Sequence, residues 1–215
     1  KYFIDGMNIN SENVARDLGV YISDNCDTSP HVEKITKKAH GVLSQIRRAT
    51  IVRDSYSFSK IYQAFVRPLL ESAVPSWNPF KRCDIEALEK VQRRSLRMIS
   101  DIGSLTYEEK LKKLNIESLE NRRRRGDCIE TFKYLNGFNN VDVQLFSFVR
   151  ERHNKDTRSH ANDYLVPEKA NLNIRKYFFT NRVTAAWNDL PNAVKEAPSV
   201  NAFKNRYDKY IKTCT

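Results

Sequence analysis

The sequence predicts a mainly helical protein with a short β-hairpin at its N-terminus. From His31 onward, most apolar residues recur at spacings of three and four, which is typical of amphipathic helices. Before that point apolar and polar residues alternate, and Asp5-Gly6 is a common hairpin turn. The chain of 215 residues has only 6 glycines and 7 prolines, which argues against a turn-rich all-β fold.

The N-terminal segment is predicted to be a hairpin. The stretch "KYFIDGMNI" (1–9) alternates and turns at Asp5-Gly6, and "VARDLGVYI" (14–22) has strand character of its own. The polar stretch "DNCDTSPH" (24–31) then ends the pattern. We therefore expect a first domain of residues 1–25.

The first helix is predicted from His31 to Thr50, with Ser29 and Pro30 as start signals. Its apolar stripe consists of Val32, Ile35, Ala39, Val42, Leu43 and Ile46. The basic residues of this helix lie off that stripe: Lys34, Lys37, Lys38, Arg47 and Arg48. A second helix is expected over 57–66, with Pro68 kinking or ending it, and "LLESAVPSW" (69–77) is compatible with a further helix.

The next helix is predicted to begin with Asp84 as its N-cap and to run to Ile99. Its buried side is expected to contain Ile85, Leu88, Val91 and either Met98 or Ile99. A second stripe on the same helix is basic and contains Lys90, Arg93, Arg94 and Arg97. A short amphipathic helix follows, with Thr106 as its cap, and it places the adjacent acids Glu108 and Glu109 in its first turn, where the helix dipole favours them.

A longer helix is expected from Ser118 to Leu135, where Asn136-Gly137 is a stop signal. It contains four consecutive arginines, Arg122 to Arg125, which sweep most of the way around the helix axis. They cannot all lie on one solvated face. We predict that one or two pair inward with acids such as Glu117, Glu120 or Asp127, and that the others face a phosphate backbone.

The end of the chain is predicted to be a loop followed by a helical region. Residues 150–171 are polar and read as a long loop or linker, and residues 172–215 as helices. One helix ends at Pro191 and another starts at Ser199. The aromatic residues of this region recur at helical spacing, and we expect them to be core: Phe178, Phe179, Trp187, Phe203 and Tyr207.

The residues suggest binding rather than catalysis. The net charge of +11 and the pI of about 9.5 favour a polyanionic partner. The four histidines and four cysteines form no metal-ligand or nucleophile pattern, and Glu108-Glu109 is the only adjacent acid pair. No apolar run is long enough for a membrane span. Ion pairing of Arg93, Arg94, Arg97 and Arg122–Arg125 with Glu86, Glu89, Glu117 and Glu120 is the alternative to phosphate binding.

Several long segments resemble the region after the palm in reverse transcriptases of LINE-type, non-LTR retrotransposons, especially the jockey-like group. They are "IYQAFVRPLLESAVPSWNPF" (61–80), "IEALEKVQRRSLRMI" (85–99), "YEEKLKKLNIESLENRRRRGDCIETFKYLNG" (107–137), "TRSH" (157–160), "RKYFFTNRVTAAWNDLPNAV" (175–194) and "APSVNAFKNRYDKY" (197–210). "RDLGVYI" (16–22) is similar to the element that closes the palm and grips the primer, with Leu18, Gly19 and Val20 matching it. "LLES" (69–72) departs from the more usual His-Leu-Glu-Tyr.

The resemblance implies a fragment of an RNA-directed DNA polymerase. Residues 1–25 would be the edge of the palm, 26–149 a thumb-like helical domain, 150–171 a linker and 172–215 a C-terminal helical region. The catalytic aspartates and the Mg²⁺ they hold would belong to an upstream palm, so the fragment itself is expected to be inactive and to need no cofactor. The parent protein would act in the nucleus, after assembly on its RNA in the cytoplasm.

The expected partners are an RNA template and a DNA primer or target DNA, with neither a membrane nor a small-molecule substrate. The candidate contacts are Lys34, Lys37, Lys38, Lys90, Arg93, Arg94, Arg97, Arg122, Arg123, Arg124, Arg125, Arg175, Lys176 and Arg182. The alternative is a non-catalytic helical scaffold for protein–protein contacts, derived from a defunct or repurposed copy of the element.

Overall fold

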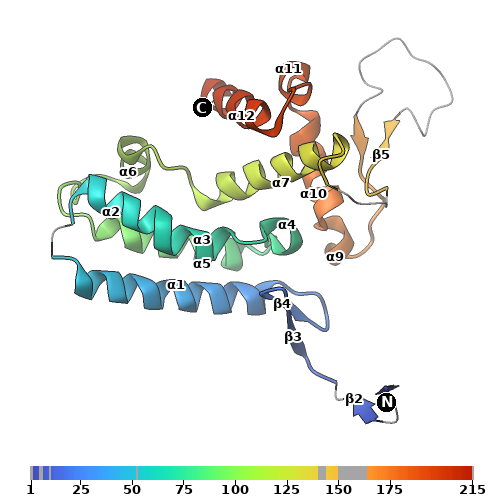
Figure 1. The fold of residues 1–215 in the computed structure, drawn as a ribbon, viewed down its shortest axis with the longest axis horizontal. Coiled ribbons are helices and arrows are strands. Elements are labelled where there is room, and N and C mark those ends of the chain that lie inside the picture. The colour runs from blue at the N-terminus through green and yellow to red at the C-terminus, as the bar shows by residue number, and fades with distance from the viewer. Residues whose placement is uncertain are drawn as a thin grey trace. The chain divides into compact units, whose positions relative to one another are not determined.

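The structure is a computed structural model that describes residues 2–4, 7–9, 11–51, 53–139, 144–149 and 164–214. It is mainly helical with short strands at the N-terminus, which confirms the predicted fold class (Figure 1). The chain divides into two compact units, residues 1–73 with 77–119 and residues 74–76 with 120–215. This division falls inside the helical segment that the sequence analysis had predicted over 26–149.

Two separate hairpins form the N-terminal segment. Strands β1 (Tyr2–Ile4) and β2 (Met7–Ile9) pair antiparallel, and so do β3 (Val14–Asp17) and β4 (Val20–Ser23). The predicted turn at Asp5-Gly6 lies outside the described residues. The β3–β4 turn is made by Leu18 and Gly19, whose φ angles are +44° and +90°. Two successive positive φ angles fit the right-handed twist of a tight hairpin.

Helices α1 (Ser29–Ala49) and α5 (Arg82–Arg97) pack side by side and run parallel. Near the starts of both helices, the Ser29 hydroxyl donates to Asp84 over 2.8 Å; further along both, His40 in the middle of α1 contacts Arg94 in the last turn of α5 at 3.3 Å. The prediction of Asp84 as the N-cap is wrong, since α5 begins at Arg82 with Lys81 at the cap. The Asp84 carboxylate instead lies buried inside the first turn, where it accepts the hydrogen bond from Ser29.

The helix that returns between these two continues past Pro68. It consists of α2 (Ser55–Ile61), a π-helical turn (Tyr62–Val66) and α3 (Arg67–Glu71). Proline lacks an N–H group and its ring crowds the carbonyl one turn earlier. The wider turn, in which Arg67 N–H donates to the Tyr62 carbonyl, comes directly before the proline. The helix ends at Glu71 with Ser72 as its C-cap, and the short α4 (Val74–Trp77) follows.

The predicted cap of the next helix is confirmed. Thr106 accepts a hydrogen bond from the Glu109 N–H, and Glu109 accepts one from the Thr106 N–H, forming a capping box on α6 (Tyr107–Leu114). One cluster of buried residues in this unit consists of Phe58, Leu96, Ile99, Ile102 and Ile116.

The second unit contains α7 (Leu119–Leu135), β5 (Ser147–Phe148), β6 (Leu165–Val166), α9 (Asn173–Lys176), α10 (Phe179–Asn188), α11 (Asn192–Lys195) and α12 (Val200–Cys214). Its core includes Cys128, Phe132, Phe146, Val183, Trp187, Phe203 and Tyr207. The Phe203 ring stacks on those of Phe132 and Trp187, with ring centroids 4.5 Å and 5.9 Å away, respectively. Gly137, with φ of +70°, ends α7 as predicted.

Two features of this unit differ from the predictions. The predicted loop 150–171 contains strand β6, which pairs with β5 and is held by Asn188, whose side chain bonds both the N–H and the carbonyl of Leu165. Residues 150–163 of that loop lie outside the described residues. The predicted helix before Pro191 is broken at Tyr177 and Phe178. Phe178 is consequently 45% exposed rather than core, whereas Trp187, Phe203 and Tyr207 are buried as expected.

Candidate nucleic-acid interface

Four arginines line a hollow at the C-terminal ends of α1 and α5. Arg47 comes from the last turn of α1, Arg94 and Arg97 come from the last turn of α5, and Arg53 comes from the linker to α2. Leu43, Met98 and Ile99 add apolar lining, and the volume is about 440 Å³. We call this cavity, which Arg47, Arg53, Arg94 and Arg97 line, the arginine hollow. None of the described residues that line it is acidic.

The linker is pinned to the end of α5 by hydrogen bonds. The Arg53 carbonyl accepts from the Ser100 N–H at 2.9 Å and from its hydroxyl at 3.0 Å. The Arg53 guanidinium in turn donates to the Thr50 carbonyl at 3.4 Å. These contacts place the Arg53 side chain beside helix residues that are far away in sequence. No sequence pattern could have indicated it.

The parallel packing explains why cations collect here. Because α1 and α5 run in the same direction, the negative ends of both helix dipoles lie at the same end of the pair. Arginines in both last turns offset that negative potential. Among the described residues, none of the four arginines of the hollow forms an ion pair with a carboxylate. Their charge therefore remains available to an anion.

His40 lies against the hollow in its neutral form. Burial, and then the charge of Arg94, lowers the pKa of His40 below its ordinary value. Since a guanidinium can only donate, Nδ1 of His40 accepts from Arg94 across 3.3 Å. The contact helps to hold Arg94 in place without neutralising it.

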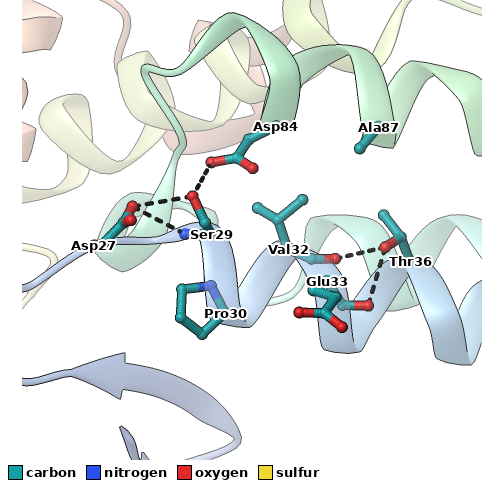
Figure 2. Close-up of a pocket in the computed structure, with 8 residues that line it drawn as sticks. All are labelled: Asp27, Ser29, Pro30, Val32, Glu33, Thr36, Asp84 and Ala87. Carbon is teal, nitrogen blue, oxygen red and sulfur yellow. Dashed lines mark hydrogen bonds between the residues drawn. The ribbon is translucent and has the colours of Figure 1, made fainter. Parts of the chain in front are cut away.

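At the opposite ends of α1 and α5, Asp27 and Asp84 already have hydrogen-bond partners. Figure 2 shows Asp27 turned toward Ser29, and Ser29 toward Asp84. Asp27 also forms an ion pair with Lys81. Burial alone would raise the pKa of Asp27, but the hydrogen bonds from Lys81 and Ser29 outweigh it and hold that pKa below its ordinary value.

The acids at this end of the helix pair have a structural role. Among the described residues, no group of three or more His, Cys, Asp or Glu side chains is arranged to hold a metal ion. The paired carboxylates near the start of α1 order the helix end instead, since Asp27 accepts from the Ser29 N–H.

The predicted basic stripe of α5 is exposed. Lys90, Arg93, Arg94 and Arg97 all face solvent, and the Arg93 guanidinium lies 5.0 Å from the Tyr107 ring centroid. Within the described ranges, none of Arg93, Arg94 and Arg97 forms the ion pair that was the alternative. The lysines of α1 are exposed as well, but they are spread around the helix. Measured around the helix axis, Lys38 lies about 180° from Arg47, and Lys34 lies about 140° from Arg47.

The arginines of α7 divide into different environments. Arg123 is buried, with 2% of its surface exposed, whereas Arg124 is exposed and Arg122 is half-buried. Arg125 donates twice to Asp208, at 2.6 and 2.8 Å, so its partner is an acid of α12 outside the predicted set. The geometric argument that the four cannot share one face is confirmed.

Arg182, another predicted contact, is a structural residue. It donates to both carboxylate oxygens of Asp127, at 3.0 and 2.9 Å, and to the Pro75 carbonyl at 2.7 Å. Its side chain is only 14% exposed. Of its neighbours, Lys176 is exposed, and Arg175 pairs with Glu168 at the surface. The prediction that Arg182 faces a nucleic acid is therefore wrong.

The predicted primer-grip residues lie at the tip of the β3–β4 hairpin. Leu18 is 98% exposed and Gly19 is also exposed, whereas Val20 is half-buried. The positive φ of Leu18 costs a non-glycine residue roughly 1 kcal/mol. An apolar side chain thus projects from a strained turn.

Comparison with known proteins leaves the family open. No protein-family model and no solved structure matches the chain. An uncharacterized protein of Caenorhabditis elegans is 23% identical over 114 residues, which are 52% of this chain and 58% of that protein. The chain therefore spans less than two thirds of the length of that relative. Among the described residues, none of the helices is both long and apolar enough to cross a membrane.

Proposed function

We propose that the chain is the nucleic-acid-binding part of a non-LTR retrotransposon reverse transcriptase, which holds the RNA template and DNA primer without making or breaking bonds itself. The observation that carries the proposal is the arginine hollow, which joins four cations from three segments and has no acid among its described lining residues. Guanidinium groups bind phosphate oxygens through paired hydrogen bonds, and such contacts dominate the affinity of proteins for nucleic acids.

The segments that resemble the retrotransposon enzymes support the same assignment. The segments 61–80 and 85–99 contain α3, α4 and most of α5, and so include two of the four arginines of the hollow, Arg94 and Arg97. In this proposal α1, α5 and the β3–β4 hairpin contact the template–primer duplex, and an upstream palm supplies the metal-dependent chemistry in the nucleus.

Binding of a labelled RNA–DNA hybrid, measured by fluorescence anisotropy at several salt concentrations, tests the proposal. Each phosphate contact that is lost should reduce the slope of log K against log salt by about one. The double variant R94Q/R97Q should therefore bind more weakly and with a slope lower by about two. The matched control K209Q/K212Q removes the same charge from two exposed lysines of α12 and should keep the wild-type slope.

The same titration separates the two function classes. If R94Q/R97Q keeps the affinity and slope of the wild type, the arginine hollow does not bind phosphate and the proposal fails. A protein–protein scaffold predicts that result, since apolar contacts do not weaken as salt rises.

A further inference from the structure

A largely exposed strip of apolar and basic residues lies around α9. Leu172, Ile174 and Phe178 are 69%, 48% and 45% exposed, respectively. The Arg175 guanidinium lies 5.1 Å from the Phe178 ring centroid, and Lys176, also exposed, lies 5.4 Å from the ring of Tyr177. We call residues 172–178 the α9 strip.

The strip is held in place from beneath. The Asn181 side chain donates to the Arg175 carbonyl at 2.8 Å and accepts from the Glu168 N–H at 2.8 Å. The Arg182 guanidinium donates to the Tyr177 carbonyl at 3.3 Å. The next aromatic residue, Phe179, turns inward and packs edge-on against Phe146. The fold therefore packs one of two adjacent phenylalanines partly into the core and leaves the other exposed, on a backbone that side-chain hydrogen bonds hold.

We propose that the α9 strip binds a single-stranded nucleic acid, with Phe178 stacking on an unpaired base and Arg175 and Lys176 contacting the flanking phosphates. The inference rests on the proposed function, which it extends to a second site. An exposed aromatic ring beside cations matches a single strand, which offers both unstacked base faces and phosphates.

The charge of the strip selects this partner over an apolar protein surface. Arg175, Lys176 and the nearby exposed Lys169 outnumber Glu168, the only acid of the segment 164–178. Glu168 already pairs with Arg175, which orients the guanidinium beside the Phe178 ring. The bases inside a duplex are already stacked on each other, so they cannot stack on the Phe178 ring. The α9 strip is therefore expected to recognise a single strand, whereas the arginine hollow is proposed to bind the template–primer duplex.

The test compares two labelled oligomers that carry the same number of phosphates, a 12-mer of thymidine and a 12-mer of abasic sites. The full chain should bind the thymidine oligomer more tightly. Phe178→Ala should weaken binding of the thymidine oligomer about 5- to 150-fold, the effect of one stacked base, ~1–3 kcal/mol. Binding of the abasic oligomer should not change. Phe178→Trp should keep the preference.

The control is Phe65→Ala, which removes a ring that is 63% exposed in the other unit and should change neither affinity. Trp77 and Trp187 are buried, so the fluorescence of the exposed tryptophan in F178W can report stacking directly. Thymidine oligomer should quench it and abasic oligomer should not. If F178A binds both oligomers as the wild type does, or loses affinity for both equally, the inference is overturned.

Failure here is distinguishable from failure of the proposed function. If F178A binds both oligomers as the wild type does and R94Q/R97Q binds the hybrid weakly, the proposal for the α9 strip is rejected and the template–primer assignment is kept. If F178A loses the preference for the thymidine oligomer and R94Q/R97Q binds the hybrid as the wild type does, the proposal for the α9 strip is kept and the proposal for the arginine hollow is rejected.

Discussion

Gln92 connects two tyrosine side chains and one backbone carbonyl in the first unit. It is fully buried, accepts from the Tyr62 hydroxyl at 2.7 Å, and donates to the Tyr107 hydroxyl at 2.9 Å and to the Glu117 carbonyl at 3.0 Å. Tyr107 donates in turn to Glu89. Burial raises the pKa of both tyrosines, so each remains a neutral donor.

Replacing Gln92 with leucine should lower the free energy of unfolding by ~1–3 kcal/mol, because the buried Tyr62 hydroxyl would lose its acceptor. Gln45→Leu is the matched control, since Gln45 is exposed on α1 and its replacement should stay within about 0.5 kcal/mol of the wild type. Urea titrations monitored by circular dichroism measure both. Equal midpoints for the two variants would contradict a structural role for the network.

His31 anchors the β3–β4 hairpin to α1. It is 3% exposed, its ring lies 4.6 Å from that of Trp77, and its Nδ1 accepts from the Tyr21 N–H at 3.2 Å. Burial lowers the pKa of His31 below its ordinary value of 6.5. Protonation would place a hydrogen on Nδ1 and remove the acceptor.

The stability of the protein should therefore decrease as the pH falls through a defined window. Since the folded-state pKa is depressed, the stabilising contribution of neutral His31 is complete above about 6.5 and is lost as pH falls through the folded-state value. Melting temperatures between pH 7.5 and 5 should decrease in the wild type and less in His31→Asn, whose amide oxygen keeps an acceptor. His40→Asn, the control, should retain the His31 contribution. If the melting temperature depends on pH in the same way in the wild type and in H31N, the proposed role of His31 is wrong.

At the scale of elements, α7 shows how a run of like charges is divided between stability and binding. Arg125 pairs with Asp208 of α12, whereas Arg124 faces solvent. The pair is partly exposed, with side chains 22% and 36% accessible, so its contribution is discounted for solvent screening.

Arg125→Gln should reduce the stability of the protein by about 1 kcal/mol and leave the salt dependence of nucleic-acid binding unchanged. Arg124→Gln should do the reverse and reduce the salt slope by about one unit. Thermal melts and anisotropy titrations on the same two variants separate the effects. If the two variants behave alike in both measurements, the division of roles along α7 is wrong.

At the scale of the whole molecule, the two units have separate cores. The residues of the second core all come from unit two, and the cluster around Leu96 and Ile99 comes from unit one. Leu88 and Phe203, both fully buried, belong to different units. Local stability can therefore differ between the units.

Leu88→Ala should cost roughly 2–5 kcal/mol and increase amide hydrogen exchange mainly in residues 29–119. Phe203→Ala should cost about 3–5 kcal/mol and act mainly on residues 120–214. Lys90→Ala, at an exposed position of α5, is the control for Leu88. Uniform acceleration of exchange across the chain in either variant would show that the units unfold together.

The sequence by itself determined most of the helices and the Thr106 cap. Apolar residues at three- and four-residue spacing located α1, α5, α7 and α12 to within a few residues, and Leu88 and Val91 are buried as predicted. The capping box of Thr106 and Glu109 and the stop at Gly137 were also predictable. These features depend on neighbours along the chain, so local spacing is sufficient to specify them.

Only the tertiary structure decided which charges are free. Arg182 and Arg124 look alike in the sequence, yet Arg182 is bound by Asp127, an acid 55 positions away, and Arg124 is exposed. Arg53 joins the hollow through Ser100, and Phe178 leaves the core because α9 and α10 are separated by a break. The partner of a long charged or aromatic side chain is set by packing between distant segments, and the spacing of residues along one segment carries no information about it.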